Sequence, residues 1–369
     1  MKQHQKHIKL TRKENNIYAP KEISILGTNC TIISDLVYNI SEFLADKYKI
    51  AYIDASHSDK DIQPNYDTFT FNKIGLLNIE KSDFINKYNE RIRFNNYDIS
   101  FINGNHFEGK KQIIILDAEK ENSIIKRLTQ INDVLFFIKK DKDSYVFDCL
   151  KEKFKDYKNI PIFEITEIDK ITKYLDTIYN SQKPELNGLV LVGGKSSRMG
   201  KDKSKLIYHG KEHSLFLADL LKEKDIETFL SVKEEKDLNY PQIKDRFLDL
   251  GPFGAICSAF LQNPNKAYLV LATDLPFVDN ELIDLLIKNR DTSKIATTVK
   301  GFSKQFPEPL IAIWEPKAYP ILLNYLSQGI SCPRKVLINS DVKIIEIDEK
   351  IVTNVNTAEE FKEIKKTIK

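Results

Sequence analysis

The chain has 369 residues, of which 41% are hydrophobic and 30% charged, and its formal net charge is +3. This composition is typical of a globular protein, and the near balance of charge argues against nucleic acid as a partner. No apolar run reaches the roughly 18 residues of a membrane-spanning helix, so no membrane partner is expected. A single core stops growing at about 250–300 residues, so the length favours two domains.

Residues 1–21 are basic and polar and lack the apolar core of a secretory signal, so we expect a flexible basic tail. His4 and His7 within this tail are expected to be solvated and not to bind a metal. The cysteines are far apart and form no C-x-x-C pair, which is typical of reduced thiols and favours a cytoplasmic location. They are Cys30, Cys149, Cys257 and Cys332.

Residues 22–180 alternate short apolar runs with amphipathic stretches, which predicts βαβ units and a parallel sheet. A strand from Glu22 ends at the Gly27 turn, and a helix to about Lys49 follows. Further predicted strands are 50–53, 97–104, 112–116 and 134–138, and a helix is predicted over 167–179.

A polar segment, Ser181–Asn187, contains Pro184 and marks the boundary to a second domain over 187–369. Its predicted strands are 189–192, 228–232, 268–272, 295–299, 309–314 and 342–347. Its predicted helices are 214–224, one from about 254, 280–288, 317–326 and 358–367. Strands 189–192 and 268–272 are apolar on both faces, which predicts the centre of an open, doubly wound, mostly parallel sheet. Such Rossmann-like sheets bind ligands beyond the carboxyl ends of their strands.

A glycine-rich loop, Leu191 to Lys203, directly follows the first of these buried strands. Gly193 and Gly194 let the backbone turn sharply and bring its N–H groups against an anion. The loop also carries hydroxyl and cationic side chains, which together suit a triphosphate. These are Ser196, Arg198, Lys201 and Lys203. The loop matches neither the Walker A pattern nor G-x-G-x-x-G, and a plain strand-to-helix connection with solvated lysines is the alternative.

Two further elements have both a functional and a structural interpretation. Asp274 follows the predicted strand 268–272, where a carboxylate can hold Mg²⁺ beside a nucleotide, although it can also cap the turn before Pro276. Asp249 to Gly254 forms a rigid turn before a helix, where an anion or a base edge could dock. His209 and His213 are expected at the surface, and Trp314 in the core.

In this order and spacing, these segments resemble the molybdenum cofactor guanylyltransferase (MobA) family over about residues 187–369. The matching patterns are L-x-G-G-x-S-x-R-M-G-x-D-K from Leu191, D-x-G-P at Asp249, D-x-P-[FY] at Asp274, Pro309-Leu-Ile-Ala-Ile313 and Asn354-Val-Asn-Thr357. Sugar-phosphate and cytidylyl transferases share the first pattern in looser form. The last pattern most favours the molybdopterin branch.

The resemblance implies transfer of GMP from GTP to molybdopterin, with release of pyrophosphate and with Mg²⁺ as cofactor. It assigns catalysis to Lys203 and Arg198, which would neutralise the phosphates, and to Asp274, which would bind Mg²⁺. The nucleotide-binding residues it implies are Leu191, Val192, Gly193, Gly194, Ser196, Met199, Gly200, Lys203, Ser231 and Asp249. The residues implied on the molybdopterin side are Arg334, Asn354 and Asn356. Molybdoenzymes or their chaperones are the further partners that the resemblance implies.

Two positions depart from the family pattern. Ser231 stands where the family often has Asn, and a hydroxyl lacks an amide's paired donor and acceptor. The stretch from Ser331 to Arg334 differs from the usual arginine-rich version, which affects the contacts expected with the pterin.

The N-terminal layout resembles a P-loop protein and the MobB adaptor often associated with MobA. Setting Gly27 to Ser34 on the Walker A pattern puts Ile32 and Ile33 where Gly and Lys belong. An isoleucine cannot replace a cation at phosphates, so residues 22–180 are expected to form a degenerate fold that serves as a scaffold or docks a partner.

Two alternatives to the guanylyltransferase hypothesis remain at this point. One is a nucleotidyltransferase with another NTP or acceptor, such as CTP with molybdopterin, or a sugar phosphate. The other is a non-catalytic carrier of molybdenum cofactor, against which the presence of both Lys203 and Asp274 argues. All catalytic hypotheses require Lys203 and Asp274 to face one metal–nucleotide pocket.

Overall fold

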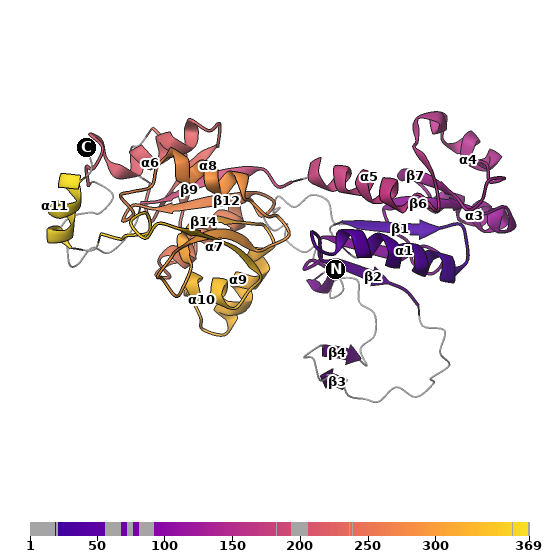
Figure 1. The fold of residues 1–369 in the computed structure, drawn as a ribbon, viewed down its shortest axis with the longest axis horizontal. Helices are drawn as coiled ribbons and strands as arrows, with labels where there is room; N and C mark the ends of the chain where they lie inside the picture. Colours follow the sequence, from indigo (N-terminus) through magenta and orange to yellow (C-terminus); the bar gives the residue numbers. More distant parts are fainter. Residues whose placement is uncertain are drawn as a thin grey trace, which may run out of the picture. The chain divides into compact units, whose positions relative to one another are not determined.

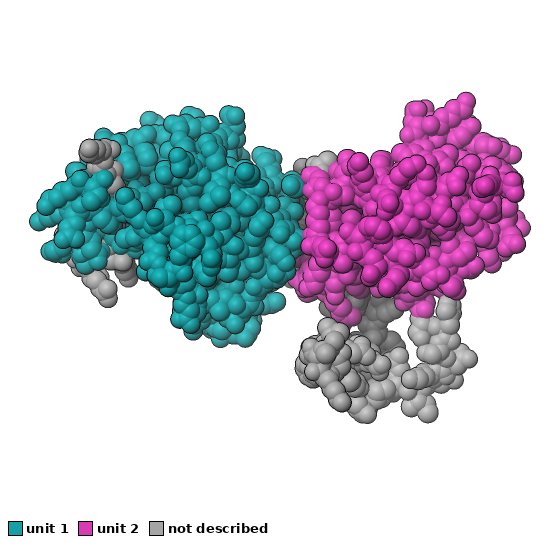
Figure 2. Space-filling model, in the orientation of Figure 1, with its two compact units in different colours: residues 1–13, 182–369 teal, residues 14–181 magenta. Residues whose placement is uncertain are grey.

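The computed structural model describes residues 19, 21–55, 68–71, 77–80, 92–181, 183–192, 206–235, 237, 239–355 and 357–367. The chain divides into two compact units, one reaching from residue 14 to Ser181 and the other containing Gln182–Lys369 (Figures 1 and 2). Both are α/β units built on mainly parallel sheets, as predicted. Within the described part of the chain, no helix is both long and apolar enough to cross a membrane.

The N-terminal unit contains a six-stranded sheet in the order β2-β5-β1-β6-β7-β8, with all strand pairs parallel. Its strands are β1 (Glu22–Leu26), β2 (Ile50–Ile53), β5 (Ile99–Asn103), β6 (Lys111–Leu116), β7 (Val134–Lys139) and β8 (Ile162–Glu164), with a separate antiparallel pair β3 (Thr68–Phe71) and β4 (Leu77–Glu80). Its helices are α1 (Cys30–Leu44), α3 (Glu121–Arg127), α4 (Asp148–Lys153) and α5 (Ile168–Ser181), with short 3₁₀ turns at Ala118–Lys120, Leu128–Gln130 and Tyr157–Asn159. Helices α1 and α5 cover one face of the sheet, and α3 and α4 contribute to the other.

The turn between β1 and α1 is too tight to repeat a Walker A loop. Gly27 has φ +101°, and a Cβ there would lie 2.3 Å from the carbonyl oxygen of Ile115, so the position requires glycine. Helix α1 begins at Cys30, and the side chain of Asn29 caps it by accepting the N–H of Ile32. The helix ends at Leu44, short of the predicted Lys49, and residues 45–47 form a turn in which the N–H of Lys47 donates to the carbonyl of Leu44 at 3.0 Å. The scaffold or docking role of this unit stays a prediction.

The C-terminal unit contains a seven-stranded sheet in the order β11-β10-β9-β12-β14-β13-β15. Its strands are β9 (Leu186–Leu191), β10 (Thr228–Val232), β11 (Gln242–Lys244), β12 (Ala267–Ala272), β13 (Ala296–Gly301), β14 (Glu308–Trp314) and β15 (Val342–Ile347). Its helices are α6 (His213–Lys222), α7 (Pro252–Gln262), α8 (Asn280–Lys288), α9 (Ala318–Ser327), α10 (Pro333–Ile338) and α11 (Ala358–Thr367). All pairs are parallel except those of β14, which runs antiparallel to both β12 and β13.

The reversal of β14 follows from the short connection before it. Only residues 302–307 separate β13 from β14, and a parallel crossover needs a dozen or more residues. The two strands therefore form a hairpin, and the sheet is mostly parallel with one reversed strand.

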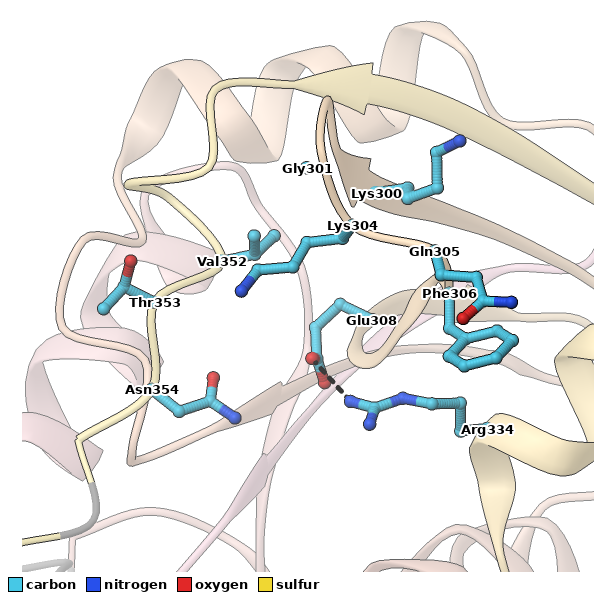
Figure 3. Close-up of a pocket in the computed structure, with 10 residues that line it drawn as sticks. All are labelled: Lys300, Gly301, Lys304, Gln305, Phe306, Glu308, Arg334, Val352, Thr353 and Asn354. Carbon is cyan, nitrogen blue, oxygen red and sulfur yellow. Dashed lines mark hydrogen bonds and ion pairs between the residues drawn. The ribbon is translucent and has the colours of Figure 1, made fainter.

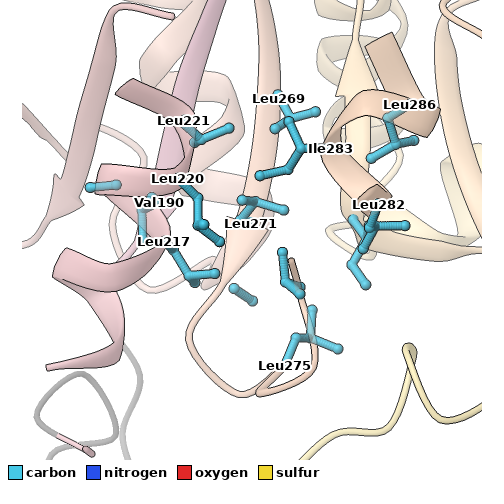
Figure 4. Packing of buried hydrophobic residues seen from close by; sticks show 14 of the residues in the cluster. Val190, Leu217, Leu220, Leu221, Leu269, Leu271, Leu275, Leu282, Ile283 and Leu286 are labelled. Carbon is cyan, nitrogen blue, oxygen red and sulfur yellow. The ribbon is translucent and has the colours of Figure 1, made fainter. Parts of the chain in front are cut away.

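Side chains alternate between the two faces of the central strands, and helices cover both faces. Val190 of β9 and Leu269 and Leu271 of β12 pack with α6 and α8 on one face (Figure 4). Leu189 and Val270 pack with α7, α9 and α10 on the other face. Burial on both sides explains why Leu189–Leu191 of β9 and all of β12 are apolar, and it leaves their carboxyl ends as the polar edge of the sheet.

Candidate functional site

The carboxyl ends of β9, β10 and β12 meet in one row. Leu191 pairs in register with Ser231 of β10 and with Ala272 of β12. Beyond the strands, the N–H of Val192 donates to the carbonyl of Ser231 at 3.2 Å, and Thr273 Oγ1 donates to the carbonyl of Leu191 at 3.4 Å. Strands β10 and β12 lie on opposite sides of β9, so the strand order reverses at β9. Doubly wound sheets bind ligands at the carboxyl edge beside such a reversal.

Most of the predicted nucleotide loop lies outside the described residues. This applies to Gly193, Gly194, Ser196, Arg198, Met199, Gly200, Lys201 and Lys203. The pairing of Lys203 with Asp274 therefore stays a prediction. Among the described residues, Leu191 and Val192 bring the end of β9 beside Ala272, two residues before Asp274.

Ser231 is linked to an acid that the sequence analysis did not single out. The buried Oγ of Ser231 donates to Asp245 Oδ1 at 2.7 Å, and the N–H of Asp245 donates to the carbonyl of Val232 at 2.8 Å. Burial raises the pKa of Asp245, while the Ser231 hydroxyl and the charge of Lys233 oppose that rise. The signal for Asp245 in the sequence was weak, because β11 before it has only three residues.

The turn that carries Asp249 is held by the helix that follows it. Asp249 has φ +60° and an 83% exposed side chain, whose Oδ1 lies 3.8 Å from Lys233 Nζ. Ser258 Oγ of α7 accepts the N–H of Arg246 at 2.8 Å. A Cβ on Gly254 would lie 2.2 Å from the carbonyl oxygen of Phe247, so the turn packs directly on the helix backbone.

The prediction that His209 and His213 are surface residues is wrong. His213 is fully buried at the start of α6, and its Nε2 donates to the carbonyl of Leu275 at 3.1 Å. His209 is half-buried, and its Nε2 donates to the carbonyl of Pro276 at 3.2 Å. Burial lowers the pKa of His213 to about 4, so its ring is neutral at pH 7. The short turn at Gly210 folds residues 206–213 back on themselves, and both rings contact the loop that follows β12.

A pocket of about 360 Å³ lies in the C-terminal unit (Figure 3). Its lining residues are Lys300, Gly301, Lys304, Gln305, Phe306, Glu308, Arg334, Val352, Thr353 and Asn354. The pocket brings together Arg334 and Asn354, two of the three residues predicted on the acceptor side. The third, Asn356, lies outside the described residues. The N–H of Val355 donates to the carbonyl of Asp274 at 2.8 Å, which joins this pocket to the carboxyl edge.

Glu308 is the pocket residue that sequence reasoning missed. Its side chain is 10% exposed, and Oε2 accepts from Arg334 Nη2 at 3.1 Å. Burial raises the pKa of Glu308, Arg334 opposes that rise, and the nearby charge of Asp274 adds to it. The one available signal was an acid between Pro307 and Pro309 at the start of an otherwise apolar strand.

The pocket offers both acceptor and cationic groups to a ligand. The Oδ1 of Asn354 is buried and has no hydrogen-bond partner among the described residues. The side chain of Lys304 extends across the pocket beside Val352, and Lys300 is paired with Glu346 at 2.8 Å (Figure 3). A ligand that carries both N–H donors and negative charge would fit this set.

Asp274 provides the carboxylate that a magnesium ion would need. Among the described residues, no group of three or more His, Cys, Asp or Glu side chains could by itself hold a metal ion. Mg²⁺ in nucleotide sites uses one or two carboxylates and takes its other ligands from phosphates and water. Among the described residues, the Asp274 carboxylate at this edge fits a Mg²⁺ ion that takes its other ligands from a nucleotide and water.

The doubly wound sheet and its polar carboxyl edge define an α/β protein with a Rossmann-like ligand-binding fold. The family model for the MobA-like NTP transferase domain matches residues 188–342. A probable molybdenum cofactor guanylyltransferase of Flavobacterium johnsoniae is 31% identical over 187 residues, which cover 48% of this chain and 96% of the relative. The chain belongs to the MobA-like NTP transferase family, and the relatives it matches are named for molybdenum cofactor biosynthesis.

Two further proteins show how far the similarity extends. A molybdenum cofactor biosynthesis bifunctional protein of Synechocystis is 33% identical over 190 residues, which cover 50% of this chain. The match spans only about half of that relative's length, 54%. The crystal structure of molybdopterin-guanine dinucleotide biosynthesis protein A from Archaeoglobus fulgidus has a TM-score of 0.42 and 23% identity, and the match covers 49% of this chain and 97% of that one.

Proposed function

We propose that this chain transfers GMP from GTP to molybdopterin and releases pyrophosphate. The observation that carries the proposal is the position of Asp274 between two polar sites. Its strand ends beside Leu191 of β9, and its own carbonyl accepts the N–H of Val355, next to the pocket residue Asn354. A nucleotide at the first site and an acceptor at the second would meet at this carboxylate.

The chemistry requires little beyond positioning and charge neutralisation. A phosphate oxygen of the acceptor attacks the α-phosphorus of GTP, a new P–O bond forms, and the bond to the β-phosphate bridging oxygen breaks. The attacking phosphate is already ionised at pH 7, so no general base is needed. Lys203 and Arg198 would neutralise charge on the phosphates, and Asp274 would hold Mg²⁺, which when bound withdraws charge from phosphate oxygens.

The pocket chemistry supports a pterin acceptor. A pterin ring presents an amino group and a ring N–H on one edge, and these donors match the carboxylate of Glu308 and the buried Oδ1 of Asn354. Lys304 and Arg334 would then attract the phosphate of the same molecule. Asn356 would join the acceptor side. Asp249 and Ser231, the latter through Asp245, would contact the nucleoside.

The wider setting of the reaction follows from this assignment. We expect it in the cytoplasm, with molybdoenzymes or their chaperones as the proteins that receive the product. The N-terminal unit would serve as a scaffold or docking domain.

The experiment is a matched panel of substrates. The purified chain is incubated with Mg²⁺, molybdopterin and one NTP at a time, and pyrophosphate is measured. Pyrophosphate release with GTP and with no other NTP supports the proposal. Pyrophosphate release only with CTP supports the cytidylyl alternative. Release with a sugar phosphate in place of molybdopterin would indicate another acceptor, and binding of molybdopterin without any release would indicate a carrier.

A further inference from the structure

Three consecutive carbonyl groups after β12 are each held by a donor from elsewhere in the chain. The carbonyl of Asp274 accepts the N–H of Val355 at 2.8 Å. The carbonyl of Leu275 accepts from His213 Nε2 at 3.1 Å, and that of Pro276 from His209 Nε2 at 3.2 Å. The loop backbone is therefore held at three consecutive residues, beginning with the predicted metal ligand.

Both imidazole rings are themselves held in place by packing. The His209 ring stacks on Phe216 with centroids 3.9 Å apart and planes 16° apart, and the rings of His209 and His213 stack at 5.8 Å. Tyr208 packs edge-on against His213 at 5.0 Å. Because stacking restricts the rotation of the rings, each Nε2–H stays directed at its carbonyl.

The donors come from the two segments that flank the proposed reaction. His209 and His213 lie on the turn that follows the nucleotide loop in the chain, and Val355 follows the pocket residue Asn354. Leu206 and Tyr208 of the turn are buried against Val355, so the two segments also pack on each other beside Asp274. A movement of either segment would be transmitted to the Asp274 loop.

The core around His209 and His213 does not require polar side chains at these two positions. The core-facing residues of α6 after His213 are mainly leucines, including Leu217 and Leu221. Leu275 itself is fully buried, so hydrophobic packing also stabilises the loop. The two hydrogen bonds from the histidines to the adjacent carbonyls of Leu275 and Pro276 also restrict the direction in which the loop backbone faces.

We propose that His213 and His209 are positioning residues that orient Asp274 towards the bound nucleotide and metal. This inference rests on the proposed function, since it assumes that Asp274 is the metal ligand. The described hydrogen bond of each ring goes to a backbone carbonyl of the loop. Each acts through the backbone of the residue it holds.

The test compares donor-removing and donor-preserving variants. His213→Met removes the Nε2–H and fills the core, whereas His213→Gln keeps an N–H donor at a similar reach. Tyr268→Phe is the matched control, because it deletes another buried side-chain hydrogen bond, Tyr268 Oη to the carbonyl of Ala259 at 2.9 Å, in the same unit. His209→Leu and His209→Gln form a second pair, whose half-buried site is less critical for folding.

Two readouts are needed. The first is binding of Mn²⁺, as a paramagnetic substitute for Mg²⁺, in the presence of GTP, measured by electron paramagnetic resonance. Loss of one orienting hydrogen bond is expected to weaken Mn²⁺ binding about tenfold in His213→Met and His209→Leu. The second is steady-state kinetics, in which kcat should fall about tenfold while KM for GTP changes less than about twofold. The glutamine variants should recover most of both losses.

The outcomes separate this inference from the proposed function. The positioning role would be overturned if folded His213→Met and His209→Leu bound Mn²⁺ as tightly as the wild type and the Tyr268→Phe control. Absence of Mn²⁺ binding by the wild type with GTP would also overturn it. A wild type that binds Mn²⁺ with GTP but releases no pyrophosphate with any acceptor would refute the proposed function alone, and the Mn²⁺ comparison would still decide the role of the histidines.

Discussion

Acidification should destabilise the C-terminal unit through His213. Its pKa in the folded chain is about 4, against an ordinary value of 6.5, because burial disfavours the charged ring. Between these two values the unfolded chain binds more protons than the folded one. The stabilisation is therefore complete above pH 6.5 and is lost as the pH falls towards 4. Lowering the pH from 7 to 4.5 should therefore reduce the free energy of unfolding by about 2 kcal/mol through His213.

The assay is urea unfolding followed by the fluorescence of Trp314. This residue is the chain's single tryptophan and is fully buried in the same unit as His213, so it reports on that unit. The comparison is between the wild type and His213→Gln, which does not titrate, at both pH values. Other acids titrate equally in the two proteins and cancel. Parallel pH dependence in the two proteins would refute the buried, neutral state of His213.

Three further changes test other parts of the structure. Arg290→Met should cost about 3–5 kcal/mol of unfolding free energy, because it leaves the fully buried Glu315 without its bidentate partner at 2.6 and 2.9 Å, and a urea midpoint close to the wild type would contradict this. Gly254→Ala should cost about 2 kcal/mol, because its Cβ would collide with the carbonyl of Phe247, and unchanged thermal unfolding would disprove that close approach. Arg334→Ala should raise KM for molybdopterin at least about tenfold with KM for GTP unchanged, and an equal effect on both constants would count against an acceptor site in this pocket.

The central strands and the carboxyl edge could be predicted from sequence because burial on both faces leaves a clear pattern. Leu189 to Val192 and Leu269 to Ala272 are apolar at every position, and the polar or glycine residues Gly193 and Thr273 follow them in the sequence. The antiparallel course of β14 had no such pattern, since it depends on the length of the connection before it and on which neighbour the hairpin meets. The short elements β11 and α10 were missed because three and six residues carry too little periodicity.

The candidate site was only partly predictable for a similar reason. Arg334 and Asn354 were named from family patterns, and they do line one pocket. Glu308 and Asp245 carry no motif, and their importance comes from neighbours that are distant in sequence. The burial of His213 depends on how a short turn folds back, and a histidine at a helix start is usually exposed.

The most direct test of the account is pyrophosphate release by Asp274→Asn with GTP, molybdopterin and Mg²⁺. The matched control is Asp284→Asn, a surface change in the same unit that removes only an exposed ion pair with Lys224. Trp314 fluorescence would verify that both variants are folded. We predict that Asp274→Asn loses at least about 100-fold in kcat while Asp284→Asn keeps wild-type activity. A folded Asp274→Asn protein with wild-type turnover would contradict the role assigned to this carboxylate.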